Sequence, residues 1–301
     1  MPEEQDVRVE VDGRTLKISN LGKVMYPDTG TTKGEVLHYY AQVAPVLLPH
    51  LADRALTRIR WPDGTGSEPF FEKNMPAGAP GWLGSVTLPS TGSRGGSGDR
   101  ITYPLVDDLA GLTFLANLGS LELHVHQWRV EDSRRLNPDR MVIDLDPGSP
   151  AGLHECCQVA LLVRERLEAA GLKSAPVTSG SKGLHLYAAL PGEQTADEVR
   201  DRAQEIAKEL AADNDAVLWK MTKALRPGKV FLDWSQNTAA KTTISPYSLR
   251  GRGTPYVAAP RTWTEVEQGA DDPDGLRHLT FTEVLDRVAA HGDLFGDLLG
   301  R

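Results

Sequence analysis

The sequence predicts a mixed α/β (α+β) fold, and two observations support this class. Short apolar or alternating runs typical of strands are interleaved with longer amphipathic stretches typical of helices. These segments do not follow the strict strand–helix–strand rhythm of a doubly wound sheet. No internal repeat and no long linker is visible, so we treat residues 1–301 as a single domain.

The composition is that of an ordinary globular protein, with 40% hydrophobic and 25% charged residues. No apolar run approaches the roughly 18 residues that a membrane span requires, and the acidic N-terminal residues do not resemble a secretory signal. The only cysteines, Cys156 and Cys157, are adjacent, which excludes a four-thiolate zinc site and favours buried positions on a helix. We therefore expect a cytoplasmic protein without a membrane partner.

The net charge of −8 alone argues weakly against a nucleic-acid partner. Basic residues nevertheless gather at 54–60, 220–229 and 241–252, whereas acidic residues gather at 193–215 and 265–297. An acidic protein with this distribution can still contain a basic groove.

Individual elements follow from local signals. Asp12-Gly13 predicts a β-hairpin within residues 7–19, and Thr32 with Glu35 forms a capping box that starts a helix near Lys33. Ser149-Pro150 is expected to cap a helix over 151–170. Further strands are expected at 55–62, 69–74, 141–146 and 229–235, and a helix that runs into a strand is expected at 112–128. A helix is expected at 195–213, with more helices at the C-terminus. A mobile, Gly/Ser-rich loop is expected at 90–100, and a loop between strands is expected at 176–190.

Two acids lie in the apolar strand MVIDLD, residues 141–146. Alternate side chains of a strand share a face, so Asp144 and Asp146 project together. Two adjacent unpaired carboxylates are costly in the interior, and a cation is expected between them. Neutralisation by Arg or Lys neighbours, or a simple role of Asp146 in starting the Pro-Gly turn, is the alternative.

A third acid, Asp233, lies in another apolar strand, KVFLDWS. Three carboxylates suit Mg²⁺ or Mn²⁺ rather than zinc. They could hold two such ions, the arrangement used for in-line displacement at phosphorus. The sequence therefore suggests phosphoryl or nucleotidyl transfer.

Two further segments carry groups that suit an anion. SGSKGLH, residues 179–185, is a Gly-punctuated loop containing Lys182, which suits phosphate oxygens but lacks a Walker A pattern; a plain turn is the alternative. In LELHVHQW, residues 121–128, alternation places Glu122, His124, His126 and Trp128 on one face. Zinc is disfavoured there because no third ligand follows, and a histidine near carboxylates more often donates to a phosphate or an acid.

The N-terminal region offers a possible phosphate site and a stacking site. Lys33 begins a helix whose free N–H groups and dipole favour an anion, with Lys23 and Asn20 nearby. Two solvated surface lysines are the alternative. Phe70 and Phe71 are adjacent in a strand, so one is expected to pack in the core while the other offers a platform for a base.

Several motifs occur in order along the chain, namely ISNLGKVMYP, TRIRWP, FFEKN, LELHVHQWR, DLDPG, SGSKGLH, FLDWSQN and SPYSLR. With them the chain resembles the polymerase domain of bacterial DNA ligase D, in the archaeo-eukaryotic primase superfamily. The resemblance implies a primase-like core with central, mostly antiparallel sheets flanked by helices. It also implies gap filling and primer extension in nonhomologous end joining, with a preference for ribonucleotides and manganese.

The resemblance also implies roles for individual residues. Asp144, Asp146 and Asp233 match catalytic ligands of two Mn²⁺ or Mg²⁺ ions. Nucleotide contacts match His124, Ser179, Lys182, Arg226 and Arg250, chiefly to the triphosphate, with Ser179 at the ribose 2′-hydroxyl. Phe71, with Phe70 beside it, matches the residue that stacks on a base. Asn20, Lys23 and Lys33 match the pocket for a DNA 5′-phosphate, and loop 90–100 matches a segment that helps to bring two ends together.

By the same resemblance, residues 1–75 form a DNA-end-binding part, 100–255 the metal and nucleotide core, and 262–301 a C-terminal helical part. The implied partners are 5′-phosphorylated DNA gaps or ends, nucleoside triphosphates, Ku and a ligase domain, in a nucleoid-associated protein. No KxDG ligase motif occurs, so a stand-alone polymerase or the polymerase portion of a larger ligase is expected.

The sequence departs from the family pattern at a few positions. Ile59 stands where relatives often carry lysine, which removes one phosphate contact, and His126 replaces a common proline. Two other functions are considered. One is a non-catalytic DNA-end bridging module that uses Lys23 and Lys33. The other is a haloacid-dehalogenase-type phosphatase, suggested by VIDLDPG, although Gly148 stands where such enzymes usually carry Thr or Val.

Overall fold

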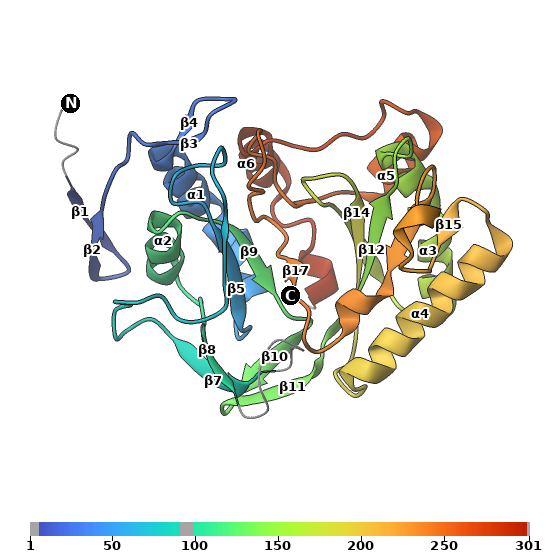
Figure 1. Ribbon diagram of the computed structural model, residues 1–301, viewed down its shortest axis with the longest axis horizontal. Helices are drawn as coiled ribbons and strands as arrows, with labels where there is room; N and C mark the ends of the chain where they lie inside the picture. Colours follow the sequence, from blue (N-terminus) through green and yellow to red (C-terminus); the bar gives the residue numbers. More distant parts are fainter. Residues whose placement is uncertain (1–5, 91–98, 300–301) are drawn as a thin grey trace.

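The computed structural model describes residues 6–90 and 99–299. Two sheets lie side by side, each backed by helices (Figure 1). The first contains six strands, in the order β15 (Val217–Leu218), β16 (Val230–Asp233), β12 (Arg140–Pro147), β14 (Leu184–Ala189), β13 (Ser174–Thr178) and β18 (Ala259–Pro260). The second contains four, in the order β17 (Thr243–Ile244), β9 (Ser120–Val125), β5 (Leu56–Arg60) and β6 (Phe70–Glu72).

Four two-stranded hairpins and several helices complete the described fold. The hairpins are β1–β2 (Val7–Val11, Arg14–Ile18), β3–β4 (Val24–Tyr26, Thr31–Thr32), β7–β8 (Ser85–Pro89, Arg100–Pro104) and β10–β11 (Trp128–Glu131, Arg134–Pro138). The helices are α1 (Lys33–Leu51), α2 (Leu109–Asn117), α3 (Leu153–Ala169), α4 (Ala196–Asp213), α5 (Trp263–Asp271) and α6 (Phe281–His291), with short 3₁₀ helices η1 (Lys223–Leu225), η2 (Trp234–Asn237) and η3 (Gly296–Leu299).

Each sheet buries one face against its helices, and its other face carries predicted site residues. In β12, Met141, Ile143 and Leu145 pack with residues of α3, α4 and α5 in one hydrophobic cluster. In β9, Leu121, Leu123 and Val125 pack with α1 and α2. Because side chains alternate along a strand, the residues between them project from the opposite faces of the two sheets, and these residues include the predicted acids and histidine.

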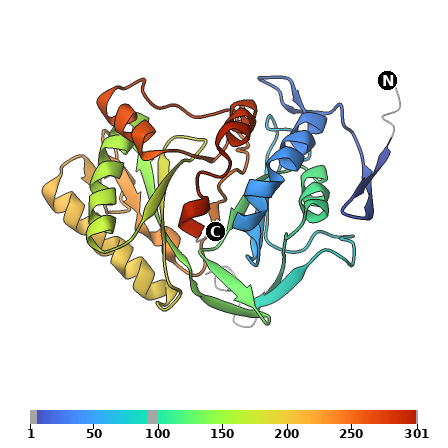
Figure 2. The ribbon, with the colours of Figure 1, turned by 180° about the vertical axis from the view of Figure 1, so that it is seen from behind.

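The C-terminal segment joins the two helix-backed units. Figure 2 shows it from behind, running between them. Phe295 is fully buried and packs edge-on against His50 of α1 and Tyr187 of β14, with ring centroids 4.8 and 5.3 Å away. Tyr247 donates a hydrogen bond of 2.6 Å to Asp293 in the same segment. An aromatic side chain shared by both units restricts their relative movement.

Most of the sequence-based expectations for the fold are confirmed. The sheets are mostly antiparallel, the capping box of Thr32 and Glu35 is present, and Cys156 and Cys157 are buried on α3. No helix in the described ranges is long and apolar enough to cross a membrane. Residues 91–98 of the loop predicted at 90–100 lie outside the described residues.

The predicted cap of α3 is wrong. The helix begins at Leu153, with Gly152 as its N-cap and the Glu155 carboxylate accepting the Gly152 N–H at 2.7 Å. Ser149-Pro150 lies in the preceding turn, because Gly148 still pairs with the chain around Lys229 and its carbonyl accepts the Ala151 N–H. The chain thus makes a turn between the acid-bearing strand and the helix.

Leu145 offers a test of this packing, because its side chain lies under the acids in the core of the six-stranded sheet. It is fully buried between α3 and the sheet. Leu145→Ala is expected to lower the free energy of unfolding by about 2–5 kcal/mol through lost burial and a cavity. Urea denaturation measures the change. Leu136→Ala, at a 42% exposed position, serves as the control and should change the value by less than about 0.5 kcal/mol.

Candidate active site

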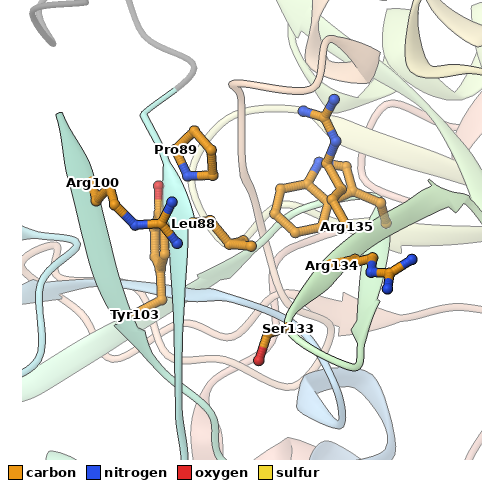
Figure 3. Close-up of a pocket in the computed structure, with 8 residues that line it drawn as sticks. Leu88, Pro89, Arg100, Tyr103, Ser133, Arg134 and Arg135 are labelled. Atoms are coloured by element: carbon orange, nitrogen blue, oxygen red, sulfur yellow. The ribbon is translucent and has the colours of Figure 1, made fainter. Parts of the chain in front are cut away.

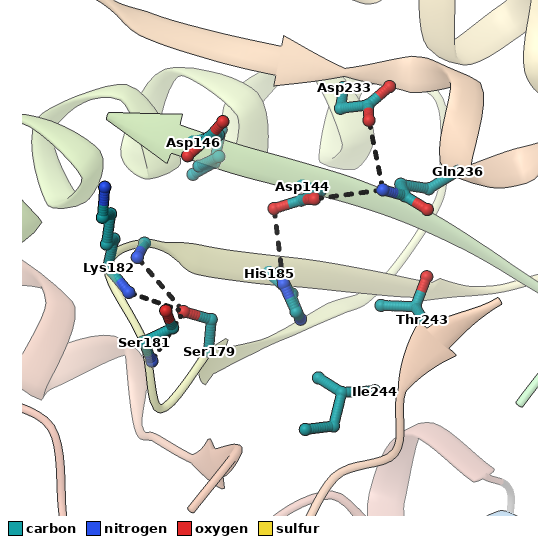
Figure 4. Close-up of polar contacts among 12 residues, drawn as sticks. Asp144, Asp146, Ser179, Ser181, Lys182, His185, Asp233, Gln236, Thr243 and Ile244 are labelled. Carbon is teal, nitrogen blue, oxygen red and sulfur yellow. Dashed lines mark hydrogen bonds and ion pairs between the residues drawn. The ribbon is translucent and has the colours of Figure 1, made fainter. Parts of the chain in front are cut away.

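The three predicted acids gather on the open face of the six-stranded sheet (Figure 4). Asp144 and Asp146 share a face of β12, and Asp144 is the direct register partner of Asp233 in β16. On the other side of β12, Asp144 pairs in register with His185 of β14. One row across three strands therefore reads His185, Asp144, Asp233. Directly opposed carboxylates repel each other, so this row requires cations or hydrogen-bond donors around it.

Asp144 receives such partners from two sides. Its Oδ1 lies 3.3 Å from His185 Nε2, and its Oδ2 accepts a 3.3 Å hydrogen bond from Gln236 Nε2. Burial alone would raise the pKa of Asp144, yet His185, Arg250 and the Gln236 hydrogen bond hold it below its ordinary value. Asp144 is therefore ionised at neutral pH.

Asp233 shares one of these partners and has others of its own. The same Gln236 amide donates to Asp233 Oδ2 at 3.1 Å. Asp233 Oδ1 accepts hydrogen bonds from the Ser235 backbone and hydroxyl, and Lys241 Nζ lies 3.4 Å from Oδ2. The Gln236 amide thus bridges the two acids that face each other across the strands.

Asp146 has a different environment. Its Oδ2 accepts a 2.6 Å hydrogen bond from Arg226 Nη1, so an arginine neutralises this acid in the described structure. Burial and the neighbouring Asp144 nevertheless raise the pKa of Asp146 above its ordinary value. A nearby cation beyond Arg226 would therefore stabilise its ionised form.

The donor set suits a hard divalent ion, although the side chains are not already arranged around one. Within residues 6–90 and 99–299, no three His, Cys, Asp or Glu side chains form a ready metal-binding group. The reason is visible in the contacts: Gln236 lies between Asp144 and Asp233, and Arg226 holds Asp146. Two opposed carboxylates beside a third whose pKa is raised are an environment in which binding of Mg²⁺ or Mn²⁺ would relieve repulsion.

The loop after β13 presents Ser179 and Lys182 beside these acids (Figure 4). Ser179 Oγ accepts N–H groups of Ser181, Lys182 and Gly183 at 3.1–3.3 Å, so the hydroxyl folds the loop around itself. A Cβ atom at Gly183 would collide with the Leu145 carbonyl oxygen. Glycine there lets the loop approach the acid-bearing strand, and the charge of Lys182 reaches Asp146.

Glu122 organises the second half of the site. This carboxylate is 4% exposed and accepts hydrogen bonds from His124 Nε2 at 2.8 Å, Arg250 Nη1 at 3.1 Å and the Gly251 N–H at 3.0 Å. Arg250 also donates to the Ser179 carbonyl oxygen at 2.8 Å. One buried acid therefore fixes two predicted nucleotide contacts and, through Arg250, ties the four-stranded sheet to the Ser179 loop.

Strand alternation predicts the correct face for Glu122 but assigns this acid no role. His185, Gln236 and Lys241 were also missed as neighbours of the acids. The sequence did contain signals for these residues. Glu122 lies two residues before His124 in LELH, His185 ends the motif SGSKGLH, and Gln236 and Lys241 lie in or just after FLDWSQN. His126 now has a structural explanation, because its ring stacks on Trp128 with centroids 4.2 Å apart and its Nδ1 lies 3.0 Å from the Lys241 carbonyl oxygen.

The predicted phosphate-binding residues lie near one another at the start of α1. Lys33 is 5% exposed, and its Nζ donates to the Ser19 carbonyl oxygen at 2.6 Å, so it is not a solvated surface lysine. Lys23 contacts Asp63 at 2.7 Å, and the turn from Asn20 to Lys23 packs on the helix start. The expectation of free helix N–H groups is wrong, because those of Lys33 and Gly34 already donate to carbonyl oxygens of the preceding turn.

The expectation that one phenylalanine packs in the core is also wrong. Phe70 and Phe71 are 56% and 60% exposed. They lie on β6, the edge strand of the four-stranded sheet, where neither face is covered at this position. Phe71 pairs in register with Ile59, which pairs with Glu122, so Phe71 shares the face of the sheet that carries the nucleotide-side residues.

Comparison with known proteins identifies the family of this chain. A family model described as LigD, primase-polymerase domain, matches residues 32–295. The chain is 48% identical over 286 residues to the multifunctional non-homologous end joining protein LigD of Mycolicibacterium smegmatis, covering 94% of this chain and 36% of that protein. It is 35% identical to the bifunctional non-homologous end joining protein LigD of Bacillus subtilis, covering 94% of this chain and 44% of that protein.

A solved structure is also similar: the polymerase domain of Mycobacterium tuberculosis ligase D in complex with DNA. It has a TM-score of 0.88 and 44% identity, covering 95% of this chain and 98% of that one. The fold and the family together define the chain as a nucleotidyltransferase of the primase-polymerase class, as the sequence predicted. The chain belongs to the LigD primase-polymerase domain family. It spans little more than a third of the length of the mycobacterial relative. These comparisons support neither the phosphatase nor the non-catalytic bridging module.

The buried Glu122 carboxylate predicts a defined pH dependence of stability. Burial alone would raise the pKa of Glu122. His124 and Arg250 outweigh this effect and lower the pKa to about 2 from an ordinary value of 4.5. A lowered pKa stabilises the fold above the ordinary value, and this contribution disappears as the pH falls from 4.5 toward 2. Glu122→Gln should therefore cost roughly 2–3 kcal/mol at neutral pH.

Urea unfolding at a series of pH values measures this difference. The gap between the wild-type protein and Glu122→Gln should narrow as the pH falls below 4.5. Glu209→Gln, at an exposed site on α4, is the control. A gap that stays constant with pH would contradict the assigned role of the charge.

Proposed function

We propose that this chain extends primers and fills gaps at 5′-phosphorylated DNA ends during nonhomologous end joining, using nucleoside triphosphates. The observation that carries the proposal is the row that sets Asp144 directly opposite Asp233, beside Asp146 and the Ser179 loop. Membership in the LigD primase-polymerase domain family and similarity to a polymerase domain solved with DNA support it.

In the proposed reaction, the oxygen of the primer 3′-hydroxyl attacks the α-phosphorus of the nucleotide and its proton passes to the solvent. A new P–O bond forms, and pyrophosphate leaves with the electrons of the broken bond. Asp144 and Asp146 would hold two Mn²⁺ or Mg²⁺ ions, and Asp233 would complete the site nearer the primer. Such ions supply charge neutralisation and in-line positioning when bound. Gln236 and Lys241 would then turn from Asp233 toward the reacting groups or the solvent.

The nucleotide would lie between the two sheets. Lys182, Arg226 and Arg250 provide positive charge for the triphosphate, and His124, held by Glu122, provides a ring nitrogen. The Ser179 hydroxyl accepts loop N–H groups but retains its own proton for a ribose 2′-oxygen, which supports a ribonucleotide preference. Ile59 supplies no charge, so the triphosphate depends more heavily on these remaining groups.

The DNA end would be bound at the turn before α1. The backbone N–H of Lys33 donates to the carbonyl oxygen of Lys23 at 2.8 Å, so the two lysines are held next to each other. The exposed rings of Phe70 and Phe71 would stack on unpaired bases. Ku and an attached ligase domain are proposed partners of the whole protein, and the longer relatives, which are multifunctional end-joining proteins, support this proposal.

Substitution of Asp233 tests catalysis separately from DNA binding. Asp233→Asn should reduce the rate of nucleotide addition by roughly three orders of magnitude or more, because one ligand of the proposed ions is removed. Binding to 5′-phosphorylated DNA should remain within about twofold, because the predicted phosphate site lies at the start of α1 and not on the acid-bearing sheet. Primer extension on a gapped duplex, with each metal and both nucleotide types, measures the first effect, and fluorescence anisotropy measures the second.

The matched control is Asp201→Asn on the exposed face of α4. This variant should extend primers at the wild-type rate. Equal loss of extension and of DNA binding in Asp233→Asn would argue against two separate sites.

Lys23 tests the phosphate site. Lys23→Ala should reduce the preference for phosphorylated over unphosphorylated DNA ends by about tenfold, because a charged hydrogen bond contributes roughly 1.5–3 kcal/mol. Lys33→Ala should act in the same direction, with a thermal melt to check its fold because the side chain is buried. Lys17→Ala, at an exposed lysine on β2, is the control, and an unchanged preference in both test variants would refute the site.

A further inference from the structure

A basic pocket that contains none of the three predicted acids lies between two hairpins (Figure 3). The β7–β8 hairpin supplies one wall and the β10–β11 hairpin supplies the other. The pocket has a volume of about 390 Å³ and is lined by Leu88, Pro89, Arg100, Tyr103, Trp128, Ser133, Arg134 and Arg135. No role in nucleotide addition or in 5′-phosphate binding has been assigned to any of these residues.

The charge of this pocket is entirely positive. Arg100, Arg134 and Arg135 are exposed at its rim, and none of the described residues that line it is acidic. Among the described residues, no ion pair engages Arg134 or Arg135, even though Glu131 is the register partner of Arg134. In a chain with a net charge of −8, an acid-free pocket with two uncompensated guanidinium groups indicates an anionic ligand.

The floor of the pocket is apolar and aromatic. Leu88, Tyr103 and Trp128 are 3–6% exposed, and the Arg135 guanidinium lies 5.7 Å above the Trp128 ring. A planar guanidinium over an aromatic ring is a surface on which an unpaired base can stack while neighbouring arginines contact phosphates. Bases in a duplex are already stacked, so an unpaired strand fits this combination better than double-stranded DNA.

The back wall of the pocket connects to the acids. Trp128 Nε1 donates to the Ala239 carbonyl oxygen at 3.0 Å, and the stacked His126 contacts the Lys241 carbonyl oxygen at 3.0 Å. Lys241 in turn reaches Asp233. The segment that follows η2 is therefore shared by the active site and the pocket, so the two sites are connected through one short stretch of chain.

We propose that this pocket binds the unpaired strand of a DNA end, with Arg134 and Arg135 contacting its phosphates and Arg135 with Trp128 supporting a base. The proposal rests on the proposed action at DNA ends but adds an interaction that the nucleotide and 5′-phosphate sites do not supply. The ligand is single-stranded nucleic acid, and an acidic peptide is the competing possibility that the experiment must separate.

The experiment compares two labelled, 5′-phosphorylated duplexes, one blunt and one with a long 3′ single-stranded overhang, by fluorescence anisotropy over a range of salt. The double variant Arg134→Ala/Arg135→Ala should bind the overhang duplex about tenfold more weakly. The slope of log affinity against log salt should become shallower by about 0.7 for each phosphate that the variant no longer neutralises. Affinity for the blunt duplex should not change.

Two further variants sharpen the result. Arg135→Lys retains the charge but loses the planar guanidinium, so the salt slope should be kept while affinity for the overhang falls. Arg202→Ala, at an arginine on α4 outside the pocket, should behave as the wild-type protein. Thermal melting checks that each variant is folded.

Equal weakening of both duplexes, or none, would overturn the proposal, as would displacement of the overhang DNA by a glutamate-rich peptide as effectively as by an unlabelled single strand. The proposed function fails separately. A wild-type chain that does not extend primers but still requires Arg134 and Arg135 for overhang binding would retain the pocket and lose the polymerase assignment.

Discussion

The antiparallel register of β12 with its two neighbours determines the chemistry of this molecule. It places Asp144 directly opposite Asp233 on one side and opposite His185 on the other. Opposed carboxylates are unfavourable unless something compensates their charge. The contacts that surround them follow from this constraint, since Gln236 bridges the two acids and Lys241 approaches Asp233. A register shift of one residue would turn both acids of β12 into the helix-covered core.

The same alternation explains why two helix-backed sheets produce one site. β12 buries its odd-numbered residues against α3 and α4, and β9 buries its odd-numbered residues against α1 and α2. The even-numbered residues of both strands are then left for the site. Arg250 completes the connection, because it contacts Glu122 on one sheet and the Ser179 loop beside the other. The predicted metal ligands of the six-stranded sheet and the predicted nucleotide contact His124 of the four-stranded sheet are thereby linked in one charged network.

Local pattern was sufficient to predict what depends on neighbours in sequence. Alternation in MVIDLD placed Asp144 and Asp146 on one face, and Thr32 with Glu35 fixed the start of α1. Features that depend on distant parts of the chain could not be derived in this way. Nothing local states that Arg226 pairs with Asp146, that an edge strand leaves both phenylalanines exposed, or that the turn before α1 uses the helix N–H groups.

The pairings around the acids also suggest how a substrate could enter without exposing uncompensated charge. Asp146 is paired with Arg226, Asp144 with His185, and Asp233 with Lys241. In the proposed complex, divalent ions would be held by the acids, and the basic side chains that now pair with these acids would contact the phosphates of the nucleotide. Such an exchange would leave little charge unpaired, which would limit the desolvation cost of assembling the reactive complex. In this proposal Arg226, which here holds Asp146, would become a ligand of the triphosphate.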